Sequence, residues 1–196
     1  KQNDLKIPYI YDAHTLVTSA RQVNFWAKRG AVGAVLAREL TYEELKIIGE
    51  KVEIPVEVQV YGATCIHHSK RPLLDNYFSF TKQKEVPKEG LFLSEPKQPD
   101  THYSIFEDIN GTHVFATDDI NLLPYLKDLV DANLKHWKLD GIFTRGERFV
   151  RIANLFVEAK KAIEAGTWNT ELMESLNEQL IALDPGFFVK DPDEVK

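Results

Sequence analysis

The sequence predicts an α/β protein in which short parallel strands alternate with helices. Three compact apolar runs occupy residues 7–14, 31–39 and 54–62, the last with Val56, Val58 and Val60 on one face. Amphipathic segments with helix-capping signals separate these runs, at residues 19–30 and 40–51. Strands joined by helices favour parallel pairing, because the intervening helix returns the chain to the same end of the sheet.

Each of the first elements has its own local signal. The run "IPYIYDAH" (7–14) is typical of a strand buried on both faces. Ser19 is placed to cap the helix that follows, and Gly30 is placed to end it. Thr41 with Glu44 three residues later has the form of a capping box. The run 54–62 then supplies a third strand.

Residues 76–112 interrupt this alternation. The stretch is rich in lysine and proline, which predicts an exposed insertion, and Lys82, Lys84 and Lys88 are expected to be solvated or, as the alternative, to contact phosphate. The pair Asn110-Gly111 lies between two β-rich runs and predicts a hairpin with a type I′ turn. The insertion is therefore expected to end in strands.

The remaining chain predicts one more strand and three helices. A helix is expected to follow Asp118 and Asp119, either of which could cap it, with Pro124 in its first turn. Residues 136–143 predict a short strand, and residues 146–166 and 170–183 predict amphipathic helices.

Composition narrows the setting of the protein. The 196 residues are 43% hydrophobic and carry a net charge of −6, which argues against a chain that is basic overall but leaves nucleic acid open. Neither a long apolar run nor the apolar core of a secretory signal is present, so no membrane partner is expected. A single cysteine favours the reducing cytoplasm. Because the sequence begins with Lys1 and its one methionine is Met173, we expect a processed chain or a fragment.

Polar residues gather at or just beyond the carboxyl ends of the predicted strands, where parallel α/β folds assemble their sites. The candidate catalytic residues are Cys65, with His67 or His68 as its base, and Glu39. The candidate ligand-binding residues are Asp12, His14, Arg38, Tyr61, Lys138 and Asp140.

Each candidate also has a structural interpretation. Cys65 could be a small thiol that closes a strand, and Arg38 and Glu39 could form an ion pair. Lys138 and Asp140 could pair with each other. A zinc site from His14, His67 and His68 with a carboxylate has the right residue types, but no recognisable ligand spacing supports it.

The stretch "EVQVYGATCIHHSKRPLL" and the later "KLDG" resemble the collagenase-like peptidase family U-32, over roughly residues 8–165. The residues that match the family signature are Glu57, Gly62, Ala63, Cys65 and Leu74. Those that depart from it are Gln59, Thr64, Lys70, Pro72 and Asp75. The resemblance implies a TIM-type (β/α) barrel whose first strands precede Lys1. Residues 1–166 would be the C-terminal part of that barrel, with the insertion 76–112, and residues 167–196 a helical extension.

The resemblance implies two functions from different classes. The first is a peptidase that acts on peptide substrates. The alternative is tRNA modification, the hydroxylation of the wobble uridine, with a small anionic metabolite such as prephenate as the oxygen source; Arg38, Lys70 and Arg71 would suit such an anion. A non-catalytic subunit is the third interpretation.

The same resemblance bears on cofactors and assembly. Some relatives hold an iron–sulfur cluster, but a cluster needs several thiolates and this chain has one cysteine. We therefore expect neither a cluster nor zinc. A partial barrel would leave an open sheet edge, which predicts a homo-oligomer or a missing N-terminal segment that covers it.

Overall fold

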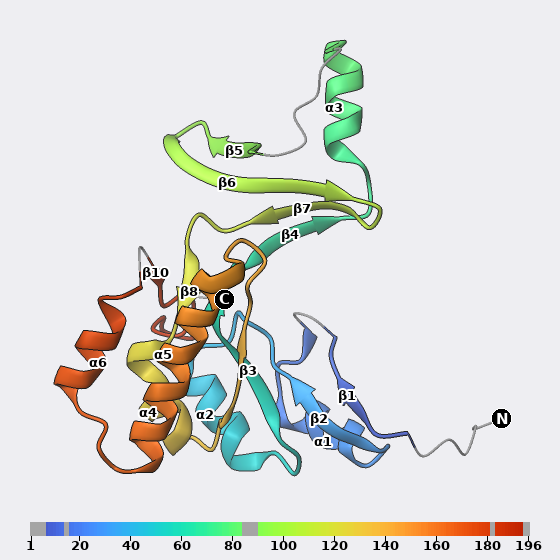
Figure 1. Cartoon of the computed structure of the whole chain (residues 1–196). Coiled ribbons are helices and arrows are strands. Elements are labelled where there is room, and N and C mark those ends of the chain that lie inside the picture. The colour runs from blue at the N-terminus through green and yellow to red at the C-terminus, as the bar shows by residue number, and fades with distance from the viewer. Residues whose placement is uncertain (1–6, 14–15, 84–89, 181–182, 194–196) are drawn as a thin grey trace. The chain divides into compact units, whose positions relative to one another are not determined.

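The computed structural model describes residues 7–13, 16–83, 90–180 and 183–193. The chain divides into two compact units. The first unit comprises residues 1–62 and 120–196, and the second comprises residues 63–119 (Figure 1). No helix within the described ranges is both long enough and apolar enough to cross a membrane.

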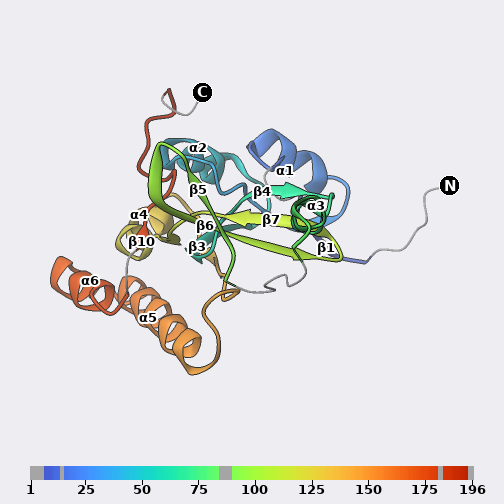
Figure 2. The ribbon, with the colours of Figure 1, turned by 90° about the horizontal axis from the view of Figure 1, so that it is seen from above.

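The first unit contains most of the helices and the larger sheet. Its strands are β1 (Tyr9–Tyr11), β2 (Ala31–Val35), β3 (Val56–Gly62), β8 (Asp119–Asn121), β9 (His136–Leu139) and β10 (Leu183–Asp184). Its helices are α1 (Ala20–Ala27), α2 (Tyr42–Lys51), the 3-10 helix η2 (Leu123–Tyr125), α4 (Leu126–Asp131), α5 (Gly146–Glu164) and α6 (Thr170–Asn177). Figure 2 shows α5 and α6 as neighbouring helices.

Parallel pairing dominates this sheet, as the alternating sequence pattern predicts. Strands β1, β2, β3 and β9 pair in parallel in that order, with Ala34 opposite Val56 and Val58 opposite Trp137. Strand β8 adds an antiparallel pair at the end of β3, where Gly62 lies opposite Ile120, and β10 pairs with β8. The mixed α/β class is confirmed. The strands among the described residues do not close into a barrel.

The prediction that the first strand is buried on both faces is wrong. In the part of the chain that the structure describes, β1 pairs only with β2 and is an edge strand. Its side chains are correspondingly open, and Ile10 is 61% exposed. An apolar run indicates that a segment prefers burial, but the number of neighbouring strands decides whether burial is achieved.

The helix-capping predictions for the first two helices are confirmed. The Ser19 side chain accepts a hydrogen bond from the backbone N–H of Gln22 at the start of α1. Thr41 and Glu44 form a full capping box at the start of α2, in which each side chain accepts from the backbone N–H of the other residue. Gly30 lies three residues past α1 with a φ of 96°, which suits glycine at a helix exit.

Leucines between β8 and β9 form the centre of the core. The side chains that are completely buried here are Leu123, Leu126, Leu129 and Leu134. Pro124 lies in the first turn of η2, as its position predicts. The proposed caps are wrong, because Asp119 begins β8 and α4 starts after Tyr125 without a side-chain cap. The backbone first pairs with β3, so the helix begins six residues later than the aspartates indicate.

The second unit is an antiparallel sheet with one helix. Its elements are β4 (Cys65–Ser69), α3 (Leu73–Thr81), β5 (Phe92–Glu95), β6 (Gln98–Asp108) and β7 (Gly111–Phe115), and the strand order is β4-β7-β6-β5. The predicted insertion 76–112 lies inside this unit and ends in strands as expected. Helix α3 is absent from the sequence prediction. Lys84 and Lys88 lie outside the described residues.

The hairpin between β6 and β7 is present, but its turn is not type I′. Asp108 lies opposite Gly111, so the loop is Ile109-Asn110, one residue earlier than predicted. A type I′ turn needs positive φ at both loop residues, and neither Ile109 nor Asn110 has it. Positive φ falls on Gly111 instead, where an added Cβ would overlap the carbonyl oxygen of Ser69.

The carboxylate of Glu107 anchors the start of α3 to the sheet. It accepts hydrogen bonds from the backbone N–H groups of Leu74 and Asp75, at 2.9 and 3.2 Å, and from the hydroxyl of Thr112 at 2.5 Å. Burial by itself would raise the pKa of Glu107, but these three bonds favour the ionised form and lower the pKa below its ordinary value.

The anchor should make α3 sensitive to acid. Because the folded pKa of Glu107 is lowered, its contribution to stability is complete above the ordinary pKa of 4.5 and is lost as the pH falls through the folded value. We expect α3 amide protons to lose protection from exchange as the pH falls from 5 toward 3. In Glu107→Gln the same amides should exchange faster already at neutral pH, because the free energy of opening α3 should fall by about 1–2 kcal/mol.

Glu95→Gln is the matched control, because Glu95 is an exposed carboxylate of β5 in the same unit. Its α3 exchange profile should follow that of the unmodified protein. An acid transition of α3 that persists unchanged in Glu107→Gln would contradict the anchoring role.

Candidate functional site

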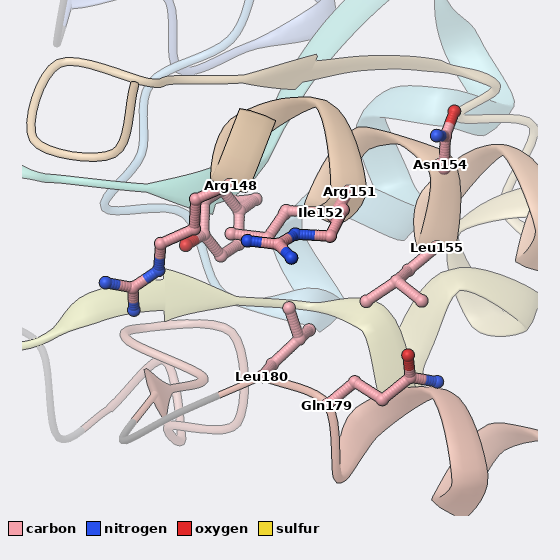
Figure 3. Close-up of a pocket in the computed structure, with 8 residues that line it drawn as sticks. Arg148, Arg151, Ile152, Asn154, Leu155, Gln179 and Leu180 are labelled. Carbon is pink, nitrogen blue, oxygen red and sulfur yellow. The ribbon is translucent and has the colours of Figure 1, made fainter. Parts of the chain in front are cut away.

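A cavity of about 350 Å³ lies within the first unit, between α5, the segment that follows α6 and the end of β3. Its lining residues are Tyr61, Arg148, Arg151, Ile152, Asn154, Leu155, Gln179 and Leu180. Figure 3 shows Arg148 and Arg151 reaching from α5, with Gln179 and Leu180 on the segment that faces them. The cavity is open to solvent on the arginine side, since both arginines are exposed.

Helical spacing brings the α5 residues of the cavity together. Arg148, Arg151, Ile152 and Leu155 stand at positions i, i+3, i+4 and i+7 of one helix, which places them along a single face. Ile152 is buried, whereas the two arginines at the start of that face are exposed. The face therefore carries charge on its outer part and an apolar wall deeper in.

The opposite wall is held by contacts that fix the end of α6. The Asn169 side chain accepts from the backbone N–H of Leu172 and caps this helix, and Leu176 is buried in the core. The side chain of Asn121, which ends β8 and lies opposite Tyr61 of β3, donates to the Asn177 side chain at 2.7 Å. These contacts position Gln179 and Leu180, which follow immediately.

Tyr61 forms the floor of the cavity. Its side chain is 3% exposed and packs edge-on against Phe156 of α5, with ring centroids 5.8 Å apart. The Tyr61 carbonyl accepts from the backbone N–H of Asp140 at 2.9 Å, which joins the ends of β3 and β9. Gly62 follows with a φ of 108°, so the chain turns sharply out of β3 at this point.

The lining chemistry suits a ligand that is anionic at one end and apolar at the other. Two guanidinium groups and the amides of Asn154 and Gln179 offer hydrogen-bond donors to a carboxylate or phosphate. Ile152, Leu155 and Leu180 offer apolar surface to the rest of the ligand. The eight lining residues include no histidine, cysteine or carboxylate, so apart from the Tyr61 hydroxyl their polar groups bind and orient a ligand rather than transfer protons.

The sequence interpretation includes Tyr61 but misses the two arginines. Arg145, Arg148 and Arg151 recur every third residue at the start of a predicted helix, which places them near one another on its surface. That spacing is the signal that could have found them. It is weak by itself, because exposed arginines on an amphipathic helix are most often solvated.

The other candidates of the first unit lie around the ends of its strands. Asp12 is exposed just after β1, Arg38 and Glu39 are half-buried after β2, and Lys138 lies within β9 opposite Gln59. Asp140 accepts from the backbone N–H of Ile142 and so stabilises its own turn. His14 lies outside the described residues. The roles of these residues stay predictions.

Glu39 has one distinctive feature. Its Oε2 atom is buried and accepts no hydrogen bond from any residue that the structure describes. Among those residues it is the one buried side-chain oxygen or nitrogen in this state. Such an oxygen costs free energy unless a donor approaches, so Glu39 has the capacity to receive a donor from a bound molecule.

Cys65, His67 and His68 belong to the second unit, at the start of β4. The half-buried Cys65 donates from Sγ to the backbone oxygen of His67 at 3.3 Å. The His68 ring stacks on His113, with centroids 4.5 Å apart, and its Nε2 lies 3.2 Å from the carbonyl oxygen of Asn110. The Cys65 sulfur therefore donates to a backbone oxygen of its own strand, and the His68 ring packs against His113 of the neighbouring strand β7.

We expect Cys65→Ser to retain most of the activity of the protein and to fold normally. Serine keeps the hydrogen bond to the backbone oxygen of His67 and changes little volume at a half-buried position. Activity should therefore fall less than about threefold, measured under the same conditions as the unmodified protein. A folded serine variant with activity reduced by orders of magnitude would establish Cys65 as a nucleophile.

The residues present do not suit an iron–sulfur cluster, which the family resemblance raised as a question. Cluster binding needs several thiolates, and the chain contains one. Within the described ranges, no group of three or more His, Cys, Asp or Glu side chains is arranged to hold a metal ion. The expectation of no cofactor stays a prediction, which elemental analysis of purified protein would test.

Comparison with known proteins finds the model of peptidase family U32 across residues 1–196. The tRNA hydroxylation protein P2 of Bacillus subtilis is 33% identical over 96% of this chain and 64% of its own length. The tRNA hydroxylation protein P1 of the same organism is 39% identical over 84% of the chain and 39% of its own length. A collagenase of Porphyromonas gingivalis is 20% identical over 91% of the chain and 45% of its own length.

The chain spans less than two thirds of the length of each of these relatives. No solved structure matches it significantly. The family resemblance inferred from "EVQVYGATCIHHSKRPLL" is confirmed by the family model and by relatives that share the same region. On this evidence the chain belongs to peptidase family U32.

Proposed function

We propose that the chain functions in tRNA modification, as part of a protein that hydroxylates tRNA in the cytoplasm. The observation that carries this proposal is the similarity to the tRNA hydroxylation protein P2, at 33% identity across 96% of the chain. The collagenase matches a comparable share of the chain at 20% identity. The alternative function of the sequence analysis is thus better supported than the peptidase interpretation.

The chemistry of the candidate site supports the same proposal. Cys65, the thiol that a peptidase would use, belongs to the second unit, and its Sγ donates to the backbone oxygen of His67. The cavity beside Tyr61 instead presents guanidinium and amide donors. We propose that it binds a small anionic metabolite, such as the oxygen source that the family resemblance implies for hydroxylation of the wobble uridine.

We further propose that the four parallel strands are part of a TIM-type barrel. Strands β1, β2, β3 and β9 follow one another in parallel, as consecutive barrel strands do. The edge strand β1 carries exposed apolar side chains, among them Ile10. An apolar edge of this kind favours a further strand or a second copy of the chain beside it.

The proposed function can be tested in a Bacillus subtilis strain that lacks tRNA hydroxylation proteins P1 and P2. The gene that encodes this chain is introduced, and the nucleosides of purified tRNA are analysed by mass spectrometry for the oxygen added to the wobble uridine. We expect hydroxylation to return. Gelatin digestion by the purified protein is measured in parallel, and gelatin cleavage without hydroxylation would replace the proposal with the peptidase function.

A non-catalytic role has its own signature in this experiment. The chain would then restore hydroxylation only together with another protein of the host, and the purified chain would not hydroxylate tRNA by itself.

A further inference from the structure

One face of the sheet in the second unit carries a row of aromatic rings. In antiparallel pairs, residues directly opposite one another lie on the same face. His68 of β4 lies opposite His113 of β7, and His113 in turn lies opposite Phe106 of β6. The row therefore crosses three neighbouring strands, which are spaced about 4.8 Å apart.

The fourth strand extends the row. Phe92 of β5 lies opposite Ser104, which is two residues before Phe106 and so on the same face of β6. His102 is two residues earlier again, and its ring meets the Phe92 ring edge-on with centroids 4.3 Å apart. We call the five rings of His68, His113, Phe106, Phe92 and His102 the aromatic face.

These rings are accessible, which is unusual for phenylalanine in a sheet. Phe106 is 45% exposed and Phe92 is 52% exposed. From Thr101 to Asp108 of β6, the residues of this face are exposed and those of the other face are half-buried. The other face is the one that carries Glu107 and Thr112, which hold the start of α3. The aromatic face is therefore the open side of the sheet.

The spacing and chemistry of the rings suit flat, unpaired nucleic-acid bases. Bases stack on aromatic rings without regard to sequence, and exposed rings on neighbouring strands of an antiparallel sheet bind two or three successive bases in known RNA-binding modules. Imidazole rings add hydrogen-bonding nitrogens that can meet base edges or phosphate.

Two cationic residues lie at one end of the aromatic face. Lys70 and Arg71 are exposed and follow Ser69 directly at the end of β4, next to the β6–β7 turn. The carboxylate of Asp108, which also faces this side, lies 3.2 Å from Nε2 of His113. The second unit has six basic and nine acidic residues overall. Stacking must therefore supply most of the affinity for RNA, and the positive charge of Lys70 and Arg71 acts only locally, on the phosphates nearest to them.

We propose that the aromatic face binds an unpaired segment of RNA, with two or three bases stacked on Phe106, Phe92 and the His68–His113 pair and phosphate contacted by Lys70 and Arg71. The inference rests on the proposed function in tRNA modification and deepens it, because it assigns the unpaired loop nucleotides of the tRNA to the second unit.

The test measures binding of a fluorescent single-stranded oligouridine of about ten nucleotides to the whole chain. Phe106→Ala and Phe92→Ala should each weaken binding about 5- to 100-fold, because each removes one stacking platform. Phe106→Tyr keeps the ring and should bind like the unmodified protein. Phe80→Ala is the matched control, since Phe80 is an 86% exposed phenylalanine of the same unit on α3, and its affinity should not change.

Several results would overturn the inference. These are an unmodified chain that does not bind the oligouridine, alanine variants that bind it normally, and equal binding of a fully double-stranded RNA, which would indicate phosphate contacts alone. A sedimentation experiment adds one more: if Phe106→Ala turns a dimer into a monomer, the aromatic face covers a second copy of the chain.

These outcomes are separate from those of the hydroxylation assay. RNA binding that depends on Phe106 and Phe92, in a chain that does not restore tRNA hydroxylation, would support the aromatic face and reject the proposed reaction. Restored hydroxylation that is unaffected by both alanine variants would support the reaction and reject this face as the RNA-binding surface.

Discussion

Replacement of Gly62 by alanine is expected to cost roughly 4 kcal/mol of folding free energy or more. Gly62 has a φ of 108°, a conformation that residues with a side chain rarely adopt. An added Cβ would also overlap the carbonyl oxygen of Asp140. That backbone cannot yield easily, because the N–H of Asp140 donates to the Tyr61 carbonyl and ties β9 to β3. Urea denaturation followed by circular dichroism measures the loss.

Gly166→Ala separates the two causes. Gly166 also has a positive φ, of 70°, but no atom lies near the position that a Cβ would take. Its replacement should therefore cost only about 1 kcal/mol, from backbone conformation alone. If Gly62→Ala is as mild as Gly166→Ala, the close approach of the β3 and β9 ends is not a fixed feature of the protein.

The double replacement Arg148→Ala and Arg151→Ala is expected to reduce tRNA hydroxylation by about 100-fold or more. Each guanidinium offers charge-assisted hydrogen bonds to an anionic ligand, worth roughly 1.5–3 kcal/mol apiece. Both side chains are exposed on α5, so the fold should not change. The measurement is the fraction of hydroxylated uridine in tRNA from the complemented strain, at matched protein levels.

Lys161→Ala is the control for loss of positive charge. Lys161 is an exposed cation in the last turn of the same helix, away from the cavity lining. Its replacement should leave hydroxylation unchanged. The arginine-to-lysine variants should be intermediate, because lysine keeps the charge but cannot present two parallel donors. Equal losses in Lys161→Ala and in the double variant would mean that general charge, and not the cavity, supports the activity.

Local signals in the sequence predict the parallel part of the fold well. Ser19 and Thr41 mark the helix starts because a capping side chain acts within three residues of itself. The β-branched runs mark β2 and β3 because alternating or continuous apolar residues are a property of the strand itself. The failed predictions depend on partners. Asp118 and Asp119 resemble helix caps, but the residues that follow them pair with β3 as strand β8, so the helix starts further along the chain.

The candidate site divides in the same way. Tyr61 could be selected because it ends a predicted strand, and it does line the cavity. The spacing of Arg148 and Arg151 is only a weak signal, because their role depends on Gln179 and Leu180, which a hydrogen bond between Asn121 and Asn177 helps to place opposite them. Phe106 could not be selected from the sequence, because it forms an aromatic row only with His113 and His68, which the strand pairing places beside it.

By itself the sequence determined the α/β class, the starts of α1 and α2, the family and the segment around Tyr61, since each depends on residues that are close in the chain. The tertiary structure alone decided that β1 is an exposed edge, that two arginines face a cavity and that five rings share one open face. These features arise where strands and helices distant in sequence meet, and strand order and register, which no local pattern encodes, place them together.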